Sequence, residues 1–281
     1  MDLEKSIKVE NLKKTYKGNI QALNGLSFEV DKGSIFGLVG PNGAGKSTTI
    51  KIMTTLTKAD GGNVIVGGHN VAVEPNRVRK IIGCVSQNSG VFKDGTAREN
   101  LILQGELYGM RGSELKIRVN ELLDKFGLNK AADRMAMTYS GGMLRKLDVA
   151  LGLIHRPHIL FLDEPTTGLD PEARSLLWKI ILSMSQEENV TVLLTTHYLE
   201  EVDRLADKLA IVNQGKVIAE GTPETLKESL NEDLIHILID NAKELQVDVI
   251  EKAIYSLKNI SDVTIDYNTI KLRVSNAPST L

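Results

Sequence analysis

The segment Gly40-Pro41-Asn42-Gly43-Ala44-Gly45-Lys46-Ser47-Thr48 decides the fold of this chain. It has the spacing G-x-x-x-x-G-K-S, follows the apolar run 35–39, and precedes residues that can continue as a helix. In such a strand, loop and helix, glycines turn backbone N–H groups inward on a polyphosphate, and the helix start adds its positive dipole end. A tight turn that uses glycine only for backbone freedom is the alternative, but it does not require the lysine and serine. We therefore predict a phosphate-binding loop.

The loop supplies the first candidate binding residues. Lys46 is expected on the β- and γ-phosphates, and the Ser47 hydroxyl on Mg²⁺. The other loop residues expected to contact the nucleotide are Asn42, Gly43, Gly45 and Thr48. The loop therefore predicts a bound polyphosphate together with Mg²⁺.

Composition narrows the choice of partners. The 281 residues allow one large domain, or a main domain with a small appendage. With 34 Lys and Arg against 36 Asp and Glu, the net charge is −2, so no global field attracts nucleic acid or an anionic membrane. We therefore predict no nucleic-acid partner.

Cysteine content and hydrophobic runs bear on location. The single cysteine, Cys84, allows no internal disulfide, which fits the cytosol, and its apolar surroundings at 81–85 predict a buried side chain. Residues 1–5 have no apolar signal core, and no segment approaches about 18 apolar residues. We expect a soluble chain that reaches a membrane only through a partner.

Hydrophobic periodicity predicts an α/β chain with a helical insert. Two strands near 7–9 and 26–30 suggest a small antiparallel subdomain at the N-terminus. Further strands are expected at 63–68 and 81–86, with a weak helix at 76–80 between them. Helices without strands follow at 98–108, 113–126 and 142–155. Alternation then resumes, with strands at 159–162, 190–194 and 208–212 and helices at 172–186 and 199–205, which predicts a mainly parallel sheet covered by helices.

The C-terminal part is expected to form a small α+β appendage. A helix opens with Thr222 as N-cap and Pro223 at its first position, and a boundary falls near Asn231. Beyond it, strand-like runs at 234–239, 263–267 and 270–274 flank a helical run at 242–257, in a βαββ order. The predicted domains are 1–230, which binds nucleotide, and 231–281.

Two carboxylates end the apolar strand 159–162. Two charged groups at the end of a buried strand cost free energy of folding, so they are expected to have a function. In phosphoryl transfer, one carboxylate holds Mg²⁺ while another can activate water. We assign Asp163 to the metal and Glu164 to the water as general base. An acidic cap for the next helix is the alternative.

Two further helix starts carry candidate residues. Ser140, Gly141 and Gly142 can form a second anion-binding helix end, where the hydroxyl and exposed N–H groups meet a γ-phosphate; alone, they would be a plain N-cap. Asp170, before Pro171, could join two subunits or cap the helix that follows, and both can hold.

Three more residues lie at strand ends or edges. His197 follows the strand 190–194, so it is expected at the sheet edge that carries the phosphate loop, where it can contact the γ-phosphate or the catalytic water. Gln87 follows the strand 81–86 and could orient that water or bind Mg²⁺, or be a surface glutamine. Tyr16 could stack on a nucleotide base or be an ordinary strand tyrosine.

Taken in order, these motifs resemble the ATP-binding subunits of ABC transporters over about Ile7 to Leu230. The similarity is greatest to the daunorubicin-resistance type of multidrug-export ATPase, through T-A-R-E-N-L at 96–101, Y-S-G-G-M at 139–143 and L-D-E-P-T-T-G-L-D-P at 162–171. The resemblance implies a P-loop NTPase fold, a helical subdomain at about 88–156, and ATP hydrolysis coupled to transport. It also implies adenine contact by Tyr16.

The resemblance implies partners as well. Two chains would face head to tail as a homodimer, with nucleotide between Lys46 of one chain and Ser140 of the other. A separate permease would hold the subunit at the cytoplasmic face of the membrane for export of a drug-like or lipophilic substrate. The common signature of the family is LSGGQ, and here Tyr139 and Met143 replace its ends, so no glutamine contact at 143 is carried over. The tail resembles the family's small C-terminal domain but stops early.

The rival interpretation is a soluble ABC ATPase that acts on DNA or ribosomes. DNA-repair relatives carry a long coiled coil in the insert, and translation-factor relatives carry two nucleotide domains in one chain. This sequence has neither feature. A pure binding module would not need Glu164 and His197 around the loop.

Overall fold

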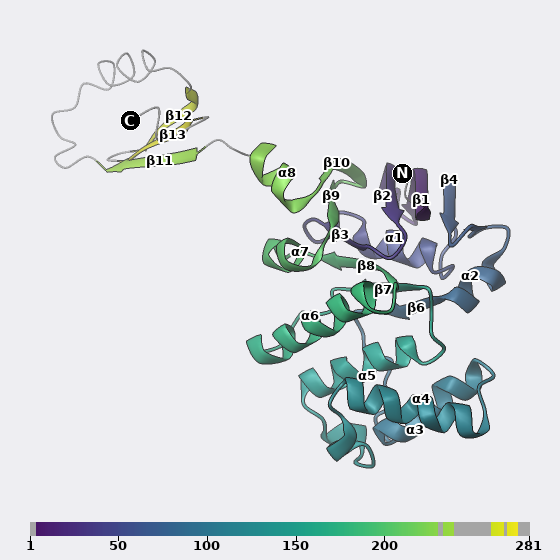
Figure 1. Cartoon of the computed structure of the whole chain (residues 1–281). Coiled ribbons are helices and arrows are strands. Elements are labelled where there is room, and N and C mark those ends of the chain that lie inside the picture. The colour runs from purple at the N-terminus through teal and green to yellow at the C-terminus, as the bar shows by residue number, and fades with distance from the viewer. Residues whose placement is uncertain (1–3, 230–232, 239–259, 267–268, 275–281) are drawn as a thin grey trace. The chain divides into compact units, whose positions relative to one another are not determined.

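The computed structural model describes residues 4–229, 233–238, 260–266 and 269–274 (Figure 1). The chain divides into two compact units, Met1–Pro223 and Glu224–Leu281. Within the described ranges, every helix falls short of the length and apolarity that a membrane span requires.

A six-stranded sheet in the order β10-β9-β3-β8-β7-β6 forms the centre of the first unit. Its strands are β3 (Ile35–Val39), β6 (Ile82–Val85), β7 (Ile159–Asp163), β8 (Thr191–Thr196), β9 (Lys208–Asn213) and β10 (Lys216–Gly221). All neighbours pair in parallel except the hairpin β9-β10, so the expected mainly parallel sheet is confirmed. The strands β3, β7 and β8 are buried along their whole length, as expected of strands covered on both faces.

A second, antiparallel sheet has the order β2-β1-β4-β5. Its strands are β1 (Lys5–Tyr16), β2 (Ile20–Asp31), β4 (Gly61–Val66) and β5 (His69–Asn70). The sequence predicted the first strand only near 7–9. The structure extends it to Tyr16, because Lys13 pairs with Asn24 on one side and with Gly61 on the other. Pairing on both edges outweighs the low strand preference of lysine.

The helix after the phosphate loop, α1 (Lys46–Met53), contacts β2 and β4 of one sheet and β7 of the other. Its buried side chains Ile50, Ile52 and Met53 join one apolar core with both sheets. In this core the rings of Phe28 and Phe36 stack with centroids 5.2 Å apart. The start of α1 is therefore held by a close-packed interior, which fixes the position of the loop before it.

The helical insert contains α3 (Ala97–Leu107), α4 (Gly112–Lys125), α5 (Gly141–Leu153) and two short 3₁₀ segments, Asn129–Ala131 and Ala136–Thr138. Figure 1 shows these helices gathered at one end of the first unit. The helix α3 begins with a capping box, in which Thr96 Oγ1 accepts from Glu99 N at 3.1 Å and Glu99 Oε2 accepts from Thr96 N at 2.8 Å. The other helices of this unit are α2 (Pro75–Ile81), α6 (Pro171–Gln186) and α7 (Leu199–Leu205).

The second unit contains most of α8 (Pro223–Ser229) and a three-stranded antiparallel sheet in the order β11-β13-β12. Its strands are β11 (Asp233–Leu238), β12 (Ile260–Asp266) and β13 (Thr269–Val274). The helix expected over 242–257 lies outside the described residues.

The prediction that Cys84 is buried was wrong. Cys84 is exposed because β6 is an edge strand of the main sheet, a position that the apolar run 81–85 cannot reveal. Its thiol still lies beside protein atoms in a groove, where desolvation raises the pKa of Cys84 to about 11. A thiol with that pKa is largely protonated at neutral pH and is a poor nucleophile.

Candidate active site

The phosphate loop turns sharply because two of its glycines adopt backbone angles that other residues rarely adopt. Gly43 has φ 82° and Gly45 has φ 110°. A Cβ on Gly45 would also lie 2.6 Å from the carbonyl oxygen of Ala22, so this position allows no side chain. No side chain caps the start of α1 at Gly45, and the first four N–H groups of a helix have no partner within it. Backbone donors at this helix start are therefore suited to an anion.

Lys46 folds back onto its own loop. Its Nζ donates to the carbonyl oxygens of Gly40 at 2.7 Å and Pro41 at 3.1 Å, and the residue is 4% exposed. The same Nζ lies 3.8 Å from Glu164 Oε1. The ammonium is thus buried, hydrogen-bonded and next to a carboxylate.

The carboxylate of Glu164 lies close to both Lys46 and His197. Its Oε1 is 3.4 Å from His197 Nδ1, in addition to its contact with Lys46. The carboxylate is 9% exposed and the His197 side chain is 32% exposed, so this cluster opens to solvent on the histidine side. The backbone of Glu164 has φ 47°, which is uncommon for a residue other than glycine. Strained conformations of this kind persist only where the surroundings fix them.

Asp163 is held by two hydroxyl groups. Its Oδ1 accepts from Ser47 Oγ at 3.1 Å and from Thr195 Oγ1 at 2.6 Å, and the residue is 6% exposed. Thr195, on β8, also accepts from Glu164 N with its Oγ1 at 3.0 Å and with its carbonyl oxygen at 3.1 Å. The loop, β7 and β8 therefore meet at the carboxyl ends of the strands, where side chains of α/β proteins commonly form sites.

The other predicted residues lie apart from this cluster. Among the described residues, no hydrogen bond or ion pair joins the side chains of Tyr16, Gln87, Ser140 or Asp170 to those of Lys46, Asp163, Glu164 or His197. Tyr16 ends β1 with Lys14 Nζ 5.6 Å from its ring centroid, and Gln87 is exposed two residues after β6. Asp170 caps α6, since its Oδ1 accepts from Ala173 N at 2.8 Å.

The start of α5 is a second glycine-containing helix start. Ser140 is its N-cap, and the Ser140 Oγ accepts from Met143 N at 3.3 Å. Ser140 and Gly141 are exposed, and a Cβ on Gly141 would meet open space. A Cβ on Gly142 would lie 2.9 Å from the Cβ of Ala173, so this glycine allows close packing against α6. In the phosphate loop before α1, Asn42 and Gly43 are also exposed, and Thr48 is half-buried.

Sequence reasoning missed two residues that contact this site. Thr195 binds both acidic residues, and Arg145 of α5 donates to the carbonyl oxygens of Asp163, Glu164 and Pro165. A threonine at the end of a buried strand, two residues before His197, was a signal that could have been used for Thr195. No local pattern marked Arg145, because its partners are far away in the sequence.

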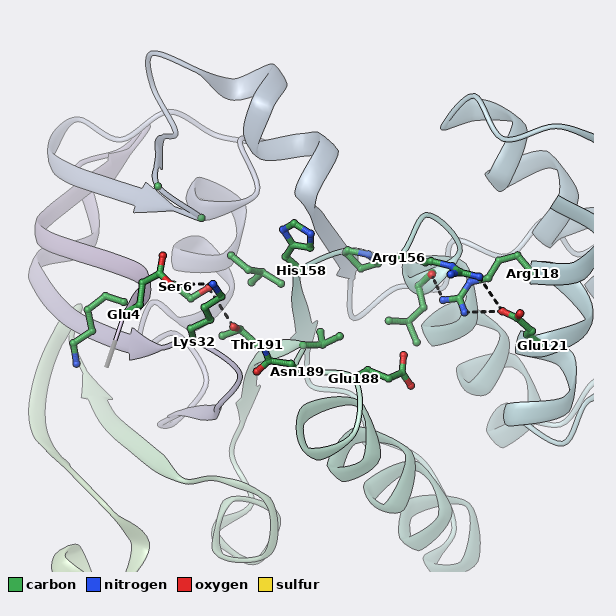
Figure 2. Close-up of a pocket in the computed structure, with 17 residues that line it drawn as sticks. Glu4, Ser6, Lys32, Arg118, Glu121, Arg156, His158, Glu188, Asn189 and Thr191 are labelled. Atoms are coloured by element: carbon green, nitrogen blue, oxygen red, sulfur yellow. Dashed lines mark hydrogen bonds and ion pairs between the residues drawn. The ribbon is translucent and has the colours of Figure 1, made fainter. Parts of the chain in front are cut away.

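A charged cavity of about 700 Å³ lies elsewhere (Figure 2). Its lining includes Ile159 and Thr191, which begin β7 and β8, so it lies at the opposite ends of these strands from Asp163 and Glu164. Its charges are paired, since Lys32 binds Glu4 and both Arg118 and Arg156 bind Glu121. None of the predicted site residues lines it. We therefore assign it no part in nucleotide chemistry.

A glycine loop at a helix start, with an acidic pair and a histidine on the neighbouring strands, defines the class of P-loop nucleotide hydrolases. The model of the ABC transporter family matches residues 23–167. The chain belongs to this family and is an ATPase, which confirms the resemblance seen in its motifs.

Curated relatives and solved structures agree with this assignment. The chain is 45% identical over 239 residues to the daunorubicin/doxorubicin resistance ATP-binding protein DrrA of Streptomyces peucetius, covering 85% of this chain and 72% of that relative. It is 38% identical over 272 residues to the linearmycin resistance ATP-binding protein LnrL of Bacillus subtilis, covering 96% and 86%. The dimeric ATP-binding cassette MJ0796 in a post-hydrolysis state with ADP and Pi matches with TM-score 0.71 and 27% identity, covering 77% of this chain and 98% of that chain.

Proposed function

We propose that this chain binds MgATP at the loop 40–48 and hydrolyses it with Glu164, as the ATPase subunit of an exporter. The observation that carries this proposal is the position of Glu164 Oε1, 3.8 Å from Lys46 Nζ and 3.4 Å from His197 Nδ1. A general base must lie within reach of the proton that it abstracts, and the contact with Lys46 places this carboxylate beside the residue expected to bind the γ-phosphate.

Each residue of the cluster has a distinct role in the proposal. Lys46 exchanges its loop carbonyl partners for the β- and γ-phosphates, a charge-assisted contact. Glu164 takes a proton from the attacking water, and His197 orients Glu164 and contacts the water or the γ-phosphate. Asn42, Gly43, Gly45 and Thr48 complete the cradle, and the ring of Tyr16 stacks on the adenine.

The residues around Ser47 fit a magnesium ion. The Ser47 hydroxyl and the Asp163 carboxylate are 3.1 Å apart, and both offer the oxygen ligands that Mg²⁺ prefers. Gln87 is our candidate for a third ligand or for orienting the water, from its place after β6. When bound, Mg²⁺ neutralises charge on the phosphate oxygens. In this proposal, substrate and water supply the remaining ligands of the ion.

We further propose that two copies of the chain share each nucleotide. Ser140, Gly141 and Gly142 form an exposed helix start, separate from the cluster of their own chain, and the related MJ0796 cassette forms a dimer. In such a dimer this helix start would meet the γ-phosphate bound by the partner's loop, with Asp170 near the joint. Residues 1–230 would form the nucleotide-binding domain, with a helical subdomain at about 88–156, and residues 231–281 an appendage.

The transport partner in this proposal is a separate membrane permease. The relatives named above are resistance ATP-binding proteins, which supports export of a drug-like or lipophilic substrate. The chain would then be a peripheral protein at the cytoplasmic face of the membrane.

A transport assay tests the proposal. Membrane proteins that co-purify with the chain are first sought, a permease found in this way is co-expressed with it, and ATP-dependent uptake of daunorubicin is measured in inverted membrane vesicles. We expect uptake with the unaltered chain and none with Glu164→Gln, while Glu172→Gln, at an exposed position in α6, serves as control. ATP hydrolysis that is unaffected by Glu164→Gln would refute the proposed chemistry. Hydrolysis without uptake of this drug or of linearmycin would refute the proposed substrate class.

A further inference from the structure

Arg145 connects the helix α5 to the ends of two neighbouring strands. The residue is 8% exposed, and its guanidinium makes four hydrogen bonds to backbone carbonyl oxygens. Nη1 donates to Ser86 at 2.6 Å, and Nε donates to Pro165 at 2.8 Å. Nη2 donates to Asp163 at 2.9 Å and to Glu164 at 3.3 Å.

These four carbonyl groups lie at or just after the carboxyl ends of two strands of the six-stranded sheet. The strands β6 and β7 are parallel neighbours, with Val85 opposite Leu162, so Ser86 and Asp163 leave the sheet side by side. The next residue after Ser86 is Gln87, and the next after Asp163 is Glu164. One planar, five-donor group therefore joins the backbone before the candidate glutamine to the backbone that carries both carboxylates.

The charge of Arg145 suits this position. Burial lowers the pKa of the guanidinium, while the carboxylates of Asp148 and Asp163 raise it. Guanidinium groups remain protonated in proteins, so the hydrogen bonds are charge-assisted. A lysine has one compact ammonium and cannot span the same carbonyl groups.

The backbone of Glu164 requires support of this kind. Its φ of 47° is left-handed, and both flanking peptide groups are held. Thr195 accepts from Glu164 N, and Arg145 donates to the carbonyl oxygens of residues 163, 164 and 165. Threonine on β8 and arginine on α5 thus fix the direction in which the Glu164 side chain leaves the strand.

We propose that Arg145 is a positioning residue for hydrolysis, which sets the backbone of Glu164 and makes its orientation depend on the position of α5. The inference rests on the proposed role of Glu164 as general base. Ser140 caps the same helix, five residues before Arg145. A shift of α5 when Ser140 meets a nucleotide is therefore transmitted through a single side chain to the base and to the residue preceding Gln87.

Steady-state hydrolysis and ATP binding test this role in the full-length chain. Arg145→Met should lower kcat on the order of 10- to 100-fold, because displacement of a catalytic group by about 1 Å has effects of this size. The Kd for ATP should change less than about threefold, since Arg145 does not contact the phosphate loop. Arg145→Lys, which keeps the charge without the fork, should also lose kcat. An unchanged kcat in either folded variant would overturn the inference.

Arg118 provides a matched control. It is also a buried arginine of the helical insert, 9% exposed, and it donates to the carbonyl oxygens of Leu153 and Ile154. It lines the cavity of Figure 2 and pairs with Glu121, and no hydrogen bond or ion pair of the described residues joins it to Asp163 or Glu164. Arg118→Met should therefore lower the thermal midpoint and leave kcat of the folded protein nearly unchanged. An equal loss of kcat in both variants would assign Arg145 a purely structural role and overturn the inference.

A double variant separates this inference from the role of Glu164. If Arg145 acts through the base, adding Arg145→Met to Glu164→Gln should lower kcat by less than about twofold further. A further loss as large as in the single Arg145 variant would overturn the inference. Near-normal turnover of Glu164→Gln alone would instead refute the proposed function. If Arg145→Met does not fold, Arg145→Lys carries the same cycle.

Discussion

Two helix starts that carry candidate binding residues, those of α1 and α5, are built in opposite ways. The N-cap of α1 is Gly45, which supplies no side-chain cap, and the first helical residues Lys46 and Ser47 contact Glu164 and Asp163. The N-cap of α5 is Ser140, whose hydroxyl caps its own helix, and among the described residues no hydrogen bond joins residues 140–142 to either carboxylate. One start is assembled with its acidic partners within a single chain, whereas the other is left exposed. The difference supports a site made of two halves from two chains.

The largest effect should come from the half that is assembled in one chain. Glu164→Gln keeps the shape of the side chain and removes the base, so hydrolysis should fall by roughly 10²–10⁴ while MgATP still binds. Nucleotide that is bound but not hydrolysed should hold two chains together as an ATP-dependent dimer on a sizing column. Normal ATP turnover by Glu164→Gln would show that Glu164 has no catalytic role. The contacts at the start of α1 would then not mark it as the catalytic half of the site.

Mixing two inactive variants tests the exposed half. Ser140→Arg places a bulky cation at the start of α5 and Lys46→Ala disables the loop, so each variant alone should lose roughly 10²-fold in turnover. A dimer of one with the other has one doubly altered site and one unaltered site, so activity or nucleotide occlusion should return. Ser113→Arg, at an exposed position in the first turn of α4, is the control for a bulky cation. Mixed dimers that show neither turnover nor occlusion would contradict a shared site.

A smaller effect is expected on ATP affinity. Lys46→Ala removes a charge-assisted contact worth roughly 1.5–3 kcal/mol, so binding should weaken by about tenfold or more in titration calorimetry. Lys51→Ala, at an exposed position in the last turn of α1, should bind ATP as before. Equal affinities in all three proteins would show that the start of α1 does not hold the phosphates.

The smallest effect concerns a carboxylate that belongs to neither helix start. Glu201 on α7 is 1% exposed and accepts from Trp178 Nε1, and burial raises its pKa. Above pH 4.5, the ordinary pKa of glutamate, the unfolded chain releases this proton while the folded chain still holds it. The Glu201 carboxyl group therefore lowers the free energy of unfolding as the pH rises from 4.5 through the raised pKa of the folded state. Glu201→Gln should thus lose less stability than the unaltered chain between pH 5 and 8, by on the order of 1 kcal/mol in urea unfolding.

Two features make this last measurement specific. Burial raises the pKa of Asp148 and Glu220 as well, and these groups remain in the variant, so they cancel in the comparison. Glu200→Gln changes the exposed neighbour of Glu201 and should leave the pH dependence as it is. Identical curves for both variants would show that the Glu201 carboxylate does not titrate differently on folding.

The sequence predicted those structural features that depend on residues close to one another along the chain. The phosphate loop and the buried runs of β3, β7 and β8 were visible because their spacing and apolarity are continuous along the chain. The extent of β1 and the exposure of Cys84 were not, because they depend on which strands pair and which strand lies at an edge. The contacts of Thr195 and Arg145 were missed for the same reason, as each acts on a backbone brought close only by folding.

The hydrogen bonds of Lys46 to Gly40 and Pro41 have a consequence for the turnover cycle. Two of the three donors of the Lys46 ammonium are used by carbonyl oxygens of its own loop. In the proposed cycle, a phosphate that binds Lys46 would replace these acceptors, and the acceptors would return when the phosphate leaves. The net free energy that Lys46 contributes to binding is therefore the difference between two sets of hydrogen bonds, and not the full strength of the new contact.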